Sequence, residues 1–442
     1  MHMAKKVFSP FFGSVNFSED PARMQRQKAI MKRELWFSFL ESHKDNCMTF
    51  LVSWWFCRKI FSNSTSTEEG YSLFRRLNFI YFCPMSTTFS YQQLFGFSKN
   101  IFLKIGCNET DADTAAKSLL LADLRGVDSH GVARLSGYIR LWEVQRVNAT
   151  PKISIVHETM STAVIDGDRG LGLVVAPFAM QVAINKAKQV GTGWVSVRNS
   201  NHFGIAGHHA MMALENDMIG MAMTNASALV APTFSKERML GTNPIAVAIP
   251  AGKQPAFVAD FATTTAANGK LEILQRKNKP MPLGWALNKE GESSTDPNAI
   301  KNGGLLLPLG GDKEHGSHKG YALGAIADIF SGILSGANYG PWVPPFPAYL
   351  PMPDHMPGEG IGHFFGTMRI DAFRTADEFK EHMDKWIKRF RSAKTIPGQE
   401  KVLIPGDPER EMEAERMNNG IPLLQPVIDD LKVIGDKFGV AL

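Results

Sequence analysis

Apolar residues after position 85 follow two spacings that alternate along the chain. Short apolar or alternating runs predict strands at residues 163–166, 194–198, 245–249 and 257–261. Apolar positions that recur every three or four residues predict helices at residues 173–190, 205–215 and 321–334. Strands that alternate with helices are typical of a mixed α/β architecture, which we therefore expect.

Two further helices are predicted ahead of these strands. Thr110 and Asp111 are suited to capping a helix that ends near Gly126. A second helix is expected to begin around Asp128 and to include Trp142. The segment 397–419 is rich in charge and is predicted to be a loop.

The first 84 residues differ in composition from the rest. They carry 12 Lys and Arg against 7 Asp and Glu, whereas the remaining residues hold 36 of each kind, so the whole net charge of +5 lies in this segment. A neutral body lacks the basic surface that binding to a nucleic-acid backbone requires. We therefore expect no nucleic-acid partner.

The same segment has no membrane or secretion signal. Its apolar run at residues 48–57 is shorter than the ~20 residues of a membrane span, and the start lacks a secretory pattern. We expect no membrane attachment and divide the chain into a leader at 1–84 and a working region at 85–442. The leader is a targeting extension, an appended interaction segment or an erroneous gene start; we favour the third, with Met85 as the natural start.

Cysteine usage bears on the compartment. The chain has only four cysteines, bunched toward its start, which is too few for a disulfide scaffold or a paired-cysteine metal site: Cys47, Cys57, Cys83 and Cys107. We expect a reducing compartment, namely the cytoplasm, or the mitochondrion if the leader is a genuine targeting segment.

A dinucleotide fingerprint is incomplete in this sequence. Gly170 and Gly172 follow a predicted strand and open a predicted helix, but Val175 stands where the third glycine belongs. Glycines that ease a tight strand-to-helix turn explain the pattern better. A classical Rossmann domain is therefore not expected.

The stretch 128–134, DSHGVAR, carries candidate acid–base chemistry. On a helix, His130 and Arg134 share one face, whereas Ser129 and His130 diverge. A 2-hydroxy acid requires a cation beside a proton carrier, because its carboxylate and its reacting oxygen lie on adjacent carbons. Histidine titrates near neutrality and suits this task. A capped helix start with exposed side chains is the alternative, and the spacing by itself favours that alternative.

A second motif, residues 199–207, lies between a predicted strand and a predicted helix. Free N–H groups at a helix start suit a pyrophosphate or a carboxylate, and Phe203 can lie against a cofactor ring. An ordinary connecting turn is the alternative interpretation. No carboxylate stands at metal-ligand spacing from His202, His208 or His209, so we expect no metal site.

Three shorter motifs each add one polar group. Thr242 can bond a substrate oxygen, Asp260 can accept from a ribose hydroxyl, and Lys319 can meet a phosphate. Each motif alone is also an ordinary turn or cap.

In this order, the motifs resemble the malate/L-lactate dehydrogenase family of the second type, which includes sulfolactate and ureidoglycolate dehydrogenases and cyclic ketimine reductases. The resemblance covers residues 91–408 and is most specific at 122–131, ADLRGVDSHG. It implies an α/β fold with a mixed sheet and a homodimer with active sites near the subunit interface. It also implies hydride transfer between NAD or NADP and a small 2-hydroxy or 2-oxo acid.

The resemblance further implies residue roles. Ser129 and His130 would form a proton relay, while Arg134 and Thr242 would hold the substrate. Members differ in whether the residue at His130 or at His202 is the acid/base, and the spacing from Arg134 favours His130. The cofactor would lie against His202, Phe203, Gly204, Ile205, Ala206, Asp260, Phe261, Ala262, His318, Lys319, Pro405, Gly406, Asp407 and Pro408.

The sequence departs from the family at residues 268–270. Asn268 stands where many relatives carry Arg or His, which puts its contact with the substrate in doubt. Gly269 would still line the substrate site, and Lys270 would complete the relay where ketimine reductases can use an aspartate. Lys270 therefore makes ketimine reduction less favoured.

Three functions stay open: a 2-hydroxy-acid dehydrogenase, a reductase of cyclic imino acids, and an inactive scaffold that keeps the fold. Retention of four chemically active residues argues against the scaffold: Ser129, His130, Arg134 and Lys319. Serine hydrolysis by Ser129 is excluded, because no Gly-x-Ser-x-Gly elbow surrounds it.

Overall fold

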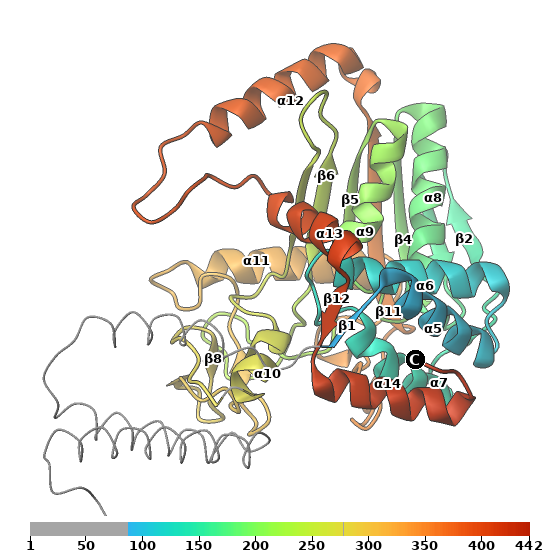
Figure 1. Ribbon diagram of the computed structural model, residues 1–442, viewed down its shortest axis with the longest axis vertical. Helices are drawn as coiled ribbons and strands as arrows, with labels where there is room; N and C mark the ends of the chain where they lie inside the picture. Colours follow the sequence, from blue (N-terminus) through green and yellow to red (C-terminus); the bar gives the residue numbers. More distant parts are fainter. Residues whose placement is uncertain (1–86, 277) are drawn as a thin grey trace, which may run out of the picture. The chain divides into compact units, whose positions relative to one another are not determined.

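A seven-stranded mixed sheet forms the centre of the fold. The computed structural model describes residues 87–276 and 278–442, so the expected leader at 1–84 lies outside the described residues (Figure 1). The strand order is β2-β3-β4-β11-β5-β6-β7. Only β3 and β4 pair in parallel, and every other neighbouring pair in this sheet is antiparallel. The mixed α/β prediction is confirmed, and a doubly wound parallel sheet of the Rossmann type is excluded.

All four predicted strands are present, together with three strands of this sheet that the sequence analysis missed. Two of these, β5 and the central β11, are mostly buried, so they show no clean alternation of polar and apolar residues. The third, β2 at the edge of the sheet, is exposed along its whole length. The strands of the sheet are β2 (Ser154–Glu158), β3 (Thr162–Asp166), β4 (Thr192–Ser200), β5 (Met218–Thr224), β6 (Ile245–Ile249), β7 (Phe257–Phe261) and β11 (Ile361–Arg369). Smaller sheets contain β1 (Thr87–Phe89), β12 (Ile421–Leu423), β8 (Ala286–Leu287), β9 (Ser293–Ser294) and β10 (Leu305–Leu306).

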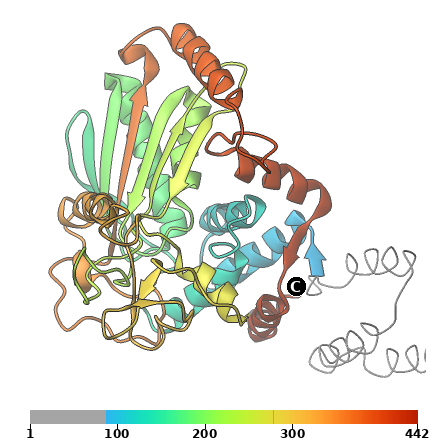
Figure 2. The same ribbon diagram turned by 90° about the vertical axis from the view of Figure 1, so that its left-hand side faces the viewer.

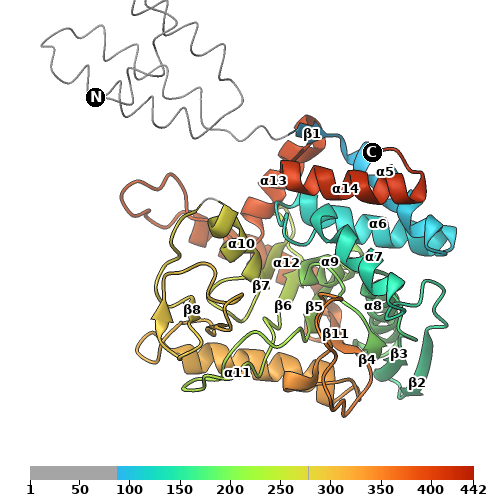
Figure 3. The same ribbon diagram turned by 90° about the horizontal axis from the view of Figure 1, so that it is seen from below.

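Helices cover both faces of the sheet. Figure 3 shows α9 and α11 on opposite sides of β5 and β6. Small residues bring α8 close to one face of the sheet: a Cβ added to Gly193 of β4 would lie 2.0 Å from the carbonyl oxygen of Ala183 in α8. The three predicted helices are confirmed as α8 (Gly172–Val190), α9 (Ala206–Met211) continuing into η2 (Met212–Asn216), and α11 (Ser317–Asp328) continuing into η3 (Ile329–Ile333).

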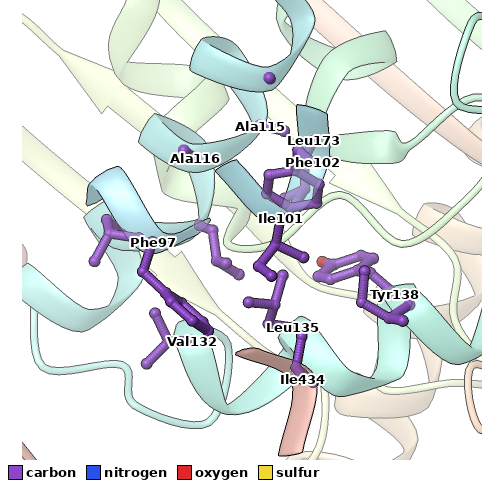
Figure 4. Close-up of a cluster of buried hydrophobic side chains, with 14 of the residues drawn as sticks. Phe97, Ile101, Phe102, Ala115, Ala116, Val132, Leu135, Tyr138, Leu173 and Ile434 are labelled. Carbon is purple, nitrogen blue, oxygen red and sulfur yellow. The ribbon is translucent and has the colours of Figure 1, made fainter. Parts of the chain in front are cut away.

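A separate helical layer packs around its own apolar core (Figures 2 and 4). Val132, Leu135 and Tyr138 are buried in this core at intervals of three residues, which fixes the segment that follows the DSH motif. The layer contains α5 (Tyr91–Lys104), α6 (Glu109–Leu124), η1 (Val132–Arg134), α7 (Leu135–Glu143), α13 (Asp407–Asn419) and α14 (Gln425–Phe438). The remaining helical segments are α10 (Asn268–Arg276), η4 (Gly340–Trp342), η5 (Ile370–Ala372) and α12 (Ala376–Arg391).

Three local predictions are wrong. The cap of α6 is Asn108, whose side chain accepts from the N–H of Asp111, so the helix begins before Thr110. The helix expected from Asp128 starts only at Val132. The segment 397–419, predicted to be a loop, contains α13, because Pro408 and the acidic first turn favour a helix start there. None of the described helices is long and apolar enough to cross a membrane.

Candidate active site

The DSH motif forms a turn rather than the first turn of a helix. Gly131 lies directly against the carboxylate of Asp123, where an added Cβ would sit 2.0 Å from Oδ1. Oδ2 of Asp123 accepts from the N–H of Val132 at 2.8 Å. The buried carboxylate of α6 therefore caps the start of η1, and the residues before Gly131 stay outside the helix.

Because this turn precedes the helix, Ser129 and His130 converge. Ser129 Oγ lies 2.9 Å from His130 Nδ1, so the prediction that these side chains diverge is wrong. Arg134 folds back and donates from Nε to the carbonyl of Ser129. The three residues thus form one hydrogen-bonded unit, although His130 and Arg134 do not share a face of an α-helix as expected.

A second histidine faces the first. His202 follows β4, and its ring lies 5.5 Å from that of His130 at an interplanar angle of 26°. His202 Nδ1 accepts from the N–H of Gly204 at 3.3 Å and lies 2.7 Å from the hydroxyl of Tyr138. The neutral ring of His202 therefore carries its proton on Nε2.

The two histidines line one small cavity. The cavity measures about 50 Å³, enough for a few water molecules. Phe346 covers it, with its ring 4.8 Å from that of His202 and 5.9 Å from Arg134 Cζ. The lining residues are His130, His202, Gly204, Thr224, Asn225, Ala226, Ser227, Thr242, Pro244, Phe346 and Ile361. The structure therefore brings together His130, His202, Gly204 and Thr242 from the predicted set.

Both cavity histidines favour the neutral form. Desolvation by the surrounding protein lowers the pKa of His130 to about 4, and the nearby Arg134 guanidinium adds to this effect. Desolvation likewise lowers the pKa of His202 well below its usual value, with further contributions from His130 and Arg134. Neutral imidazoles can accept or donate a proton within the cavity.

The predicted segment 203–206 is mostly interior. Phe203, Gly204, Ile205 and Ala206 are buried. The Phe203 ring stacks on the ring of His363 with 4.8 Å between their centroids, so the Phe203 side chain packs in the core. At the end of the segment, the N–H of Gly207 donates to Asp260 Oδ2 at 2.7 Å, which links α9 to β7.

Other cofactor candidates gather around β7. The N–H of Val258 donates to the carbonyl of Pro405 at 3.1 Å, and Gly406 packs on Val258. Asp260 and Phe261 are exposed at the end of this strand, and Ala262 follows half-buried.

Four further predicted cofactor residues differ in whether the protein already supplies their polar contacts. Asp407 already accepts from Arg391, Arg410 and the N–H of Ile404. Pro408 is exposed in the first turn of α13. His318 and Lys319 are exposed in the first turn of α11.

The departing segment 268–270 lies beside the DSH turn. A Cβ added to Gly269 would sit 2.8 Å from Ser129 Cβ, so α10 approaches the turn closely. Lys270 is exposed, and the amide of Asn268 donates to Glu272 at 2.9 Å. The backbone of Gly269 is therefore the nearest part of α10 to the predicted relay.

Sequence reasoning missed Tyr138 and Phe346 as site residues. Tyr138 was assigned to a helix without a role, although its position four residues after Arg134 was a usable signal. Phe346 lies in a proline-rich loop, where no periodicity indicates which side chain points inward. Its N–H donates to Ser227 Oγ at 2.9 Å, which anchors the loop over the cavity.

Two neutral histidines that face one covered cavity in a mixed α/β fold are typical of an enzyme that moves protons on a small molecule. A family model described as malate/L-lactate dehydrogenase matches residues 89–432, well over half of the chain. The chain belongs to the malate/L-lactate dehydrogenase family.

Named relatives support this membership. The chain is 44% identical over 349 residues to the malate dehydrogenase of Pyrococcus horikoshii, covering 79% of this chain and 94% of that protein. A solved structure of malate dehydrogenase from Pyrococcus horikoshii OT3 matches with a TM-score of 0.73 and 41% identity, over 80% of this chain and 97% of that chain. The malate/(S)-sulfolactate dehydrogenase of Methanothermus fervidus is 39% identical over 338 residues, 76% of this chain and 94% of that protein. Similarity also extends to delta1-piperideine-2-carboxylate reductase from Pseudomonas syringae, with a TM-score of 0.65 and 26% identity, over 79% of this chain and 100% of that chain.

Proposed function

We propose that this chain is a nicotinamide-dependent dehydrogenase that interconverts a small 2-hydroxy acid and its 2-oxo acid. The observation that carries the proposal is the hydrogen-bonded unit of Ser129, His130 and Arg134 beside a cavity that a second neutral histidine also lines. Malate and sulfolactate, the substrates in the relatives' names, both carry a carboxylate next to the reacting carbon.

Each residue has a chemical role in this proposal. In the oxidation direction, His130 accepts the hydroxyl proton, and Ser129 orients its ring through Nδ1. Arg134 binds the substrate carboxylate, because a guanidinium holds two oxygens at once. His202 donates a hydrogen bond from Nε2 to the substrate oxygen, and Thr242 adds a hydroxyl on the same cavity wall. Gly269 lines the substrate site beside Ser129, and Lys270 completes the relay.

The residues around β7 fit a nicotinamide dinucleotide. An exposed aromatic ring, Phe261, adjoins Asp260, whose carboxylate accepts from the N–H of Gly207, and Lys319 offers an exposed cation for a phosphate. We assign the cofactor, NAD or NADP, to these groups together with the segments 202–206 and 405–408, in which Phe203 contributes its backbone because its ring is buried against His363. When bound, the nicotinamide supplies or accepts the hydride.

We further propose a homodimer and assign the catalytic region to residues 85–442. The family match begins at residue 89, which supports this boundary. An exposed apolar stripe on α11 and η3 supports assembly, since such stripes mark protein interfaces: Ile326, Ile329, Phe330, Ile333 and Leu334. The proposed compartment is the cytoplasm, or the mitochondrion if residues 1–84 act as a targeting segment.

Reduction of cyclic imino acids is the second candidate. The structural likeness to a piperideine carboxylate reductase favours it, because such a substrate also carries a carboxylate beside the reduced carbon. The same Arg134 clamp and His130 acid serve both reactions, and turnover of each substrate separates them.

One assay panel tests the proposal. Oxidation of NADH and NADPH is followed optically with oxaloacetate, pyruvate, 3-sulfopyruvate and Δ1-piperideine-2-carboxylate, for the full chain and for protein begun at Met85. We expect turnover with at least one 2-oxo acid and equal kcat for the two proteins. Turnover of the imine alone would favour the second candidate, and silence across the panel would favour an inactive scaffold.

A further inference from the structure

Helix α13 contacts the DSH turn through one buried arginine. Arg416 is 8% exposed, and its guanidinium donates to the carbonyl of Asp123 and to the carboxylate of Asp128. Its Nη2 lies 3.3 Å from Asp128 Oδ2. Arg416 therefore joins the end of α6 to the first residue of the turn.

The two acceptors of Arg416 lie at the end of α6 and within the link between α6 and η1. Asp123 also caps η1 through the N–H of Val132, and Gly131 rests on its carboxylate. A shift of Asp123 or Asp128 would therefore move the backbone that carries His130 and Arg134. The spacing of the proton carrier and the carboxylate clamp depends on this short segment.

The chemistry of Arg416 suits this task better than that of lysine. Its planar guanidinium reaches a carbonyl and a carboxylate that belong to different residues, which a single ammonium group does not bridge in the same geometry. A buried cation is costly unless it is paired, so the contact with Asp128 compensates desolvation.

Two other residues on the same face of α13 can be compared with Arg416. Glu413, one turn before Arg416, pairs with Arg125 at 2.8 Å, and Met412 packs on Gly126. These contacts also join α13 to the end of α6, but they do not touch residues 128–134. Helix packing and support of the turn are therefore separable by mutation.

We propose that Arg416 is a positioning residue that holds the turn at 128–134 so that His130 lines the cavity and Arg134 stays hydrogen-bonded beside it. This inference rests on the proposed function, in which that pair handles the substrate. Helix α13 contacts α6, and Arg416 reaches the turn from the end of α6. Gly406 is the N-cap of α13, so the proposed cofactor loop leads directly into the helix that carries Arg416.

The test uses the variants R416M, R416K, D128N and the double variant R416M/D128N, with E413Q as the packing control. We expect R416M to raise the KM for the 2-oxo acid about tenfold and to lower kcat severalfold, because small misplacements of a clamp are costly. D128N should raise KM about threefold, R416K should fall between R416M and the unchanged chain, and the double variant should match R416M. E413Q should lower the Tm but keep KM within twofold.

Several results would overturn the proposal. These are a folded R416M with KM and kcat within twofold of the unchanged chain, additive effects in the double variant, or an equal rise of KM in E413Q. If R416M does not fold, R416K and D128N decide by the same criterion.

Hydrogen exchange of residues 124–135 separates failure of this inference from failure of the proposed function. If the unchanged chain turns over no 2-oxo acid, the function is wrong, yet faster exchange in R416M than in E413Q still supports the positioning role. Equal exchange in the two variants overturns it.

Discussion

The cavity side and the β7 side of the candidate site are built differently. On the cavity side, Ser129, His130 and Arg134 bond to one another, and His202 is fixed by Tyr138 and Gly204. On the β7 side, the proposed cofactor residues come from several elements, and Phe261 and Lys319 are exposed.

The two sides therefore differ in how far their side chains are held in place before a ligand binds. The cavity groups are held by the protein itself, so they are organised before any substrate arrives. Under the proposed function, the exposed groups around β7 would gain their partners from the cofactor. Substitutions on the cavity side should therefore change turnover, whereas those on the β7 side should change cofactor affinity.

The largest expected effect is that of His130→Ala. Loss of a positioned proton carrier typically costs 10²- to 10⁴-fold, so kcat should fall about 10³-fold. The Kd for NADH, measured by fluorescence titration, should stay within twofold. Parallel loss of NADH binding would place His130 on the cofactor side and erase the contrast between the two regions.

Arg134→Lys should have the next largest effect. Lysine keeps the charge but loses the planar fork, so kcat/KM for the 2-oxo acid should fall about 10²-fold, mainly through KM. The matched control is Arg140→Lys, an exposed arginine on α7 that should change kcat/KM less than twofold. Full activity of Arg134→Lys would show that another group binds the carboxylate.

On the cavity side, the sequence analysis selected His130 and Arg134 from their chemistry and spacing, although the reason given, a shared helical face, was wrong. The structure places His130 in the cavity lining and bonds Arg134 to the carbonyl of Ser129. The turn depends on Asp123, a buried carboxylate whose contact with Gly131 is set by tertiary packing and leaves no local pattern. Phe346 lies more than 200 residues beyond the turn in a loop without periodicity, so the roof of the cavity was not predictable.

The strands of the sheet were also predicted unevenly. The strands 245–249 and 257–261 were predicted to the residue, because apolar runs between turns mark them. The central strand β11 was missed, since burial on both faces removes alternation and Gly362 and Gly366 lower its apolar content. Local patterns therefore predicted β6 and β7, at one edge of the sheet, but not β11 at its centre.

On the β7 side, Lys319→Ala should raise the KM for the cofactor about tenfold, because one phosphate contact is lost. The KM for the 2-oxo acid should not change, which distinguishes this variant from Arg134→Lys. Lys313→Ala, a second exposed lysine near α11, is the control and should leave both constants unchanged. A rise in the KM for the acid alone would move Lys319 to the cavity side.

The smallest effect on turnover is expected from a histidine outside the cavity. Desolvation lowers the pKa of His208 to about 4, as it does for His130, but His208 bonds Ser118 at 3.1 Å and does not line the cavity. Its pKa in the folded state is below the unfolded value of about 6.5, so the unfolded state binds more protons between these values and stability falls as the pH drops through this window. Between pH 6.5 and 5, this one group should cost about 2 kcal/mol of unfolding free energy.

In urea titrations at these two pH values, His208→Asn should therefore lose about 2 kcal/mol less than the unchanged chain, while the pH profile of hydroxy-acid oxidation stays the same. An altered oxidation profile would contradict the division between cavity histidines that carry protons for the reaction and buried histidines that affect only stability.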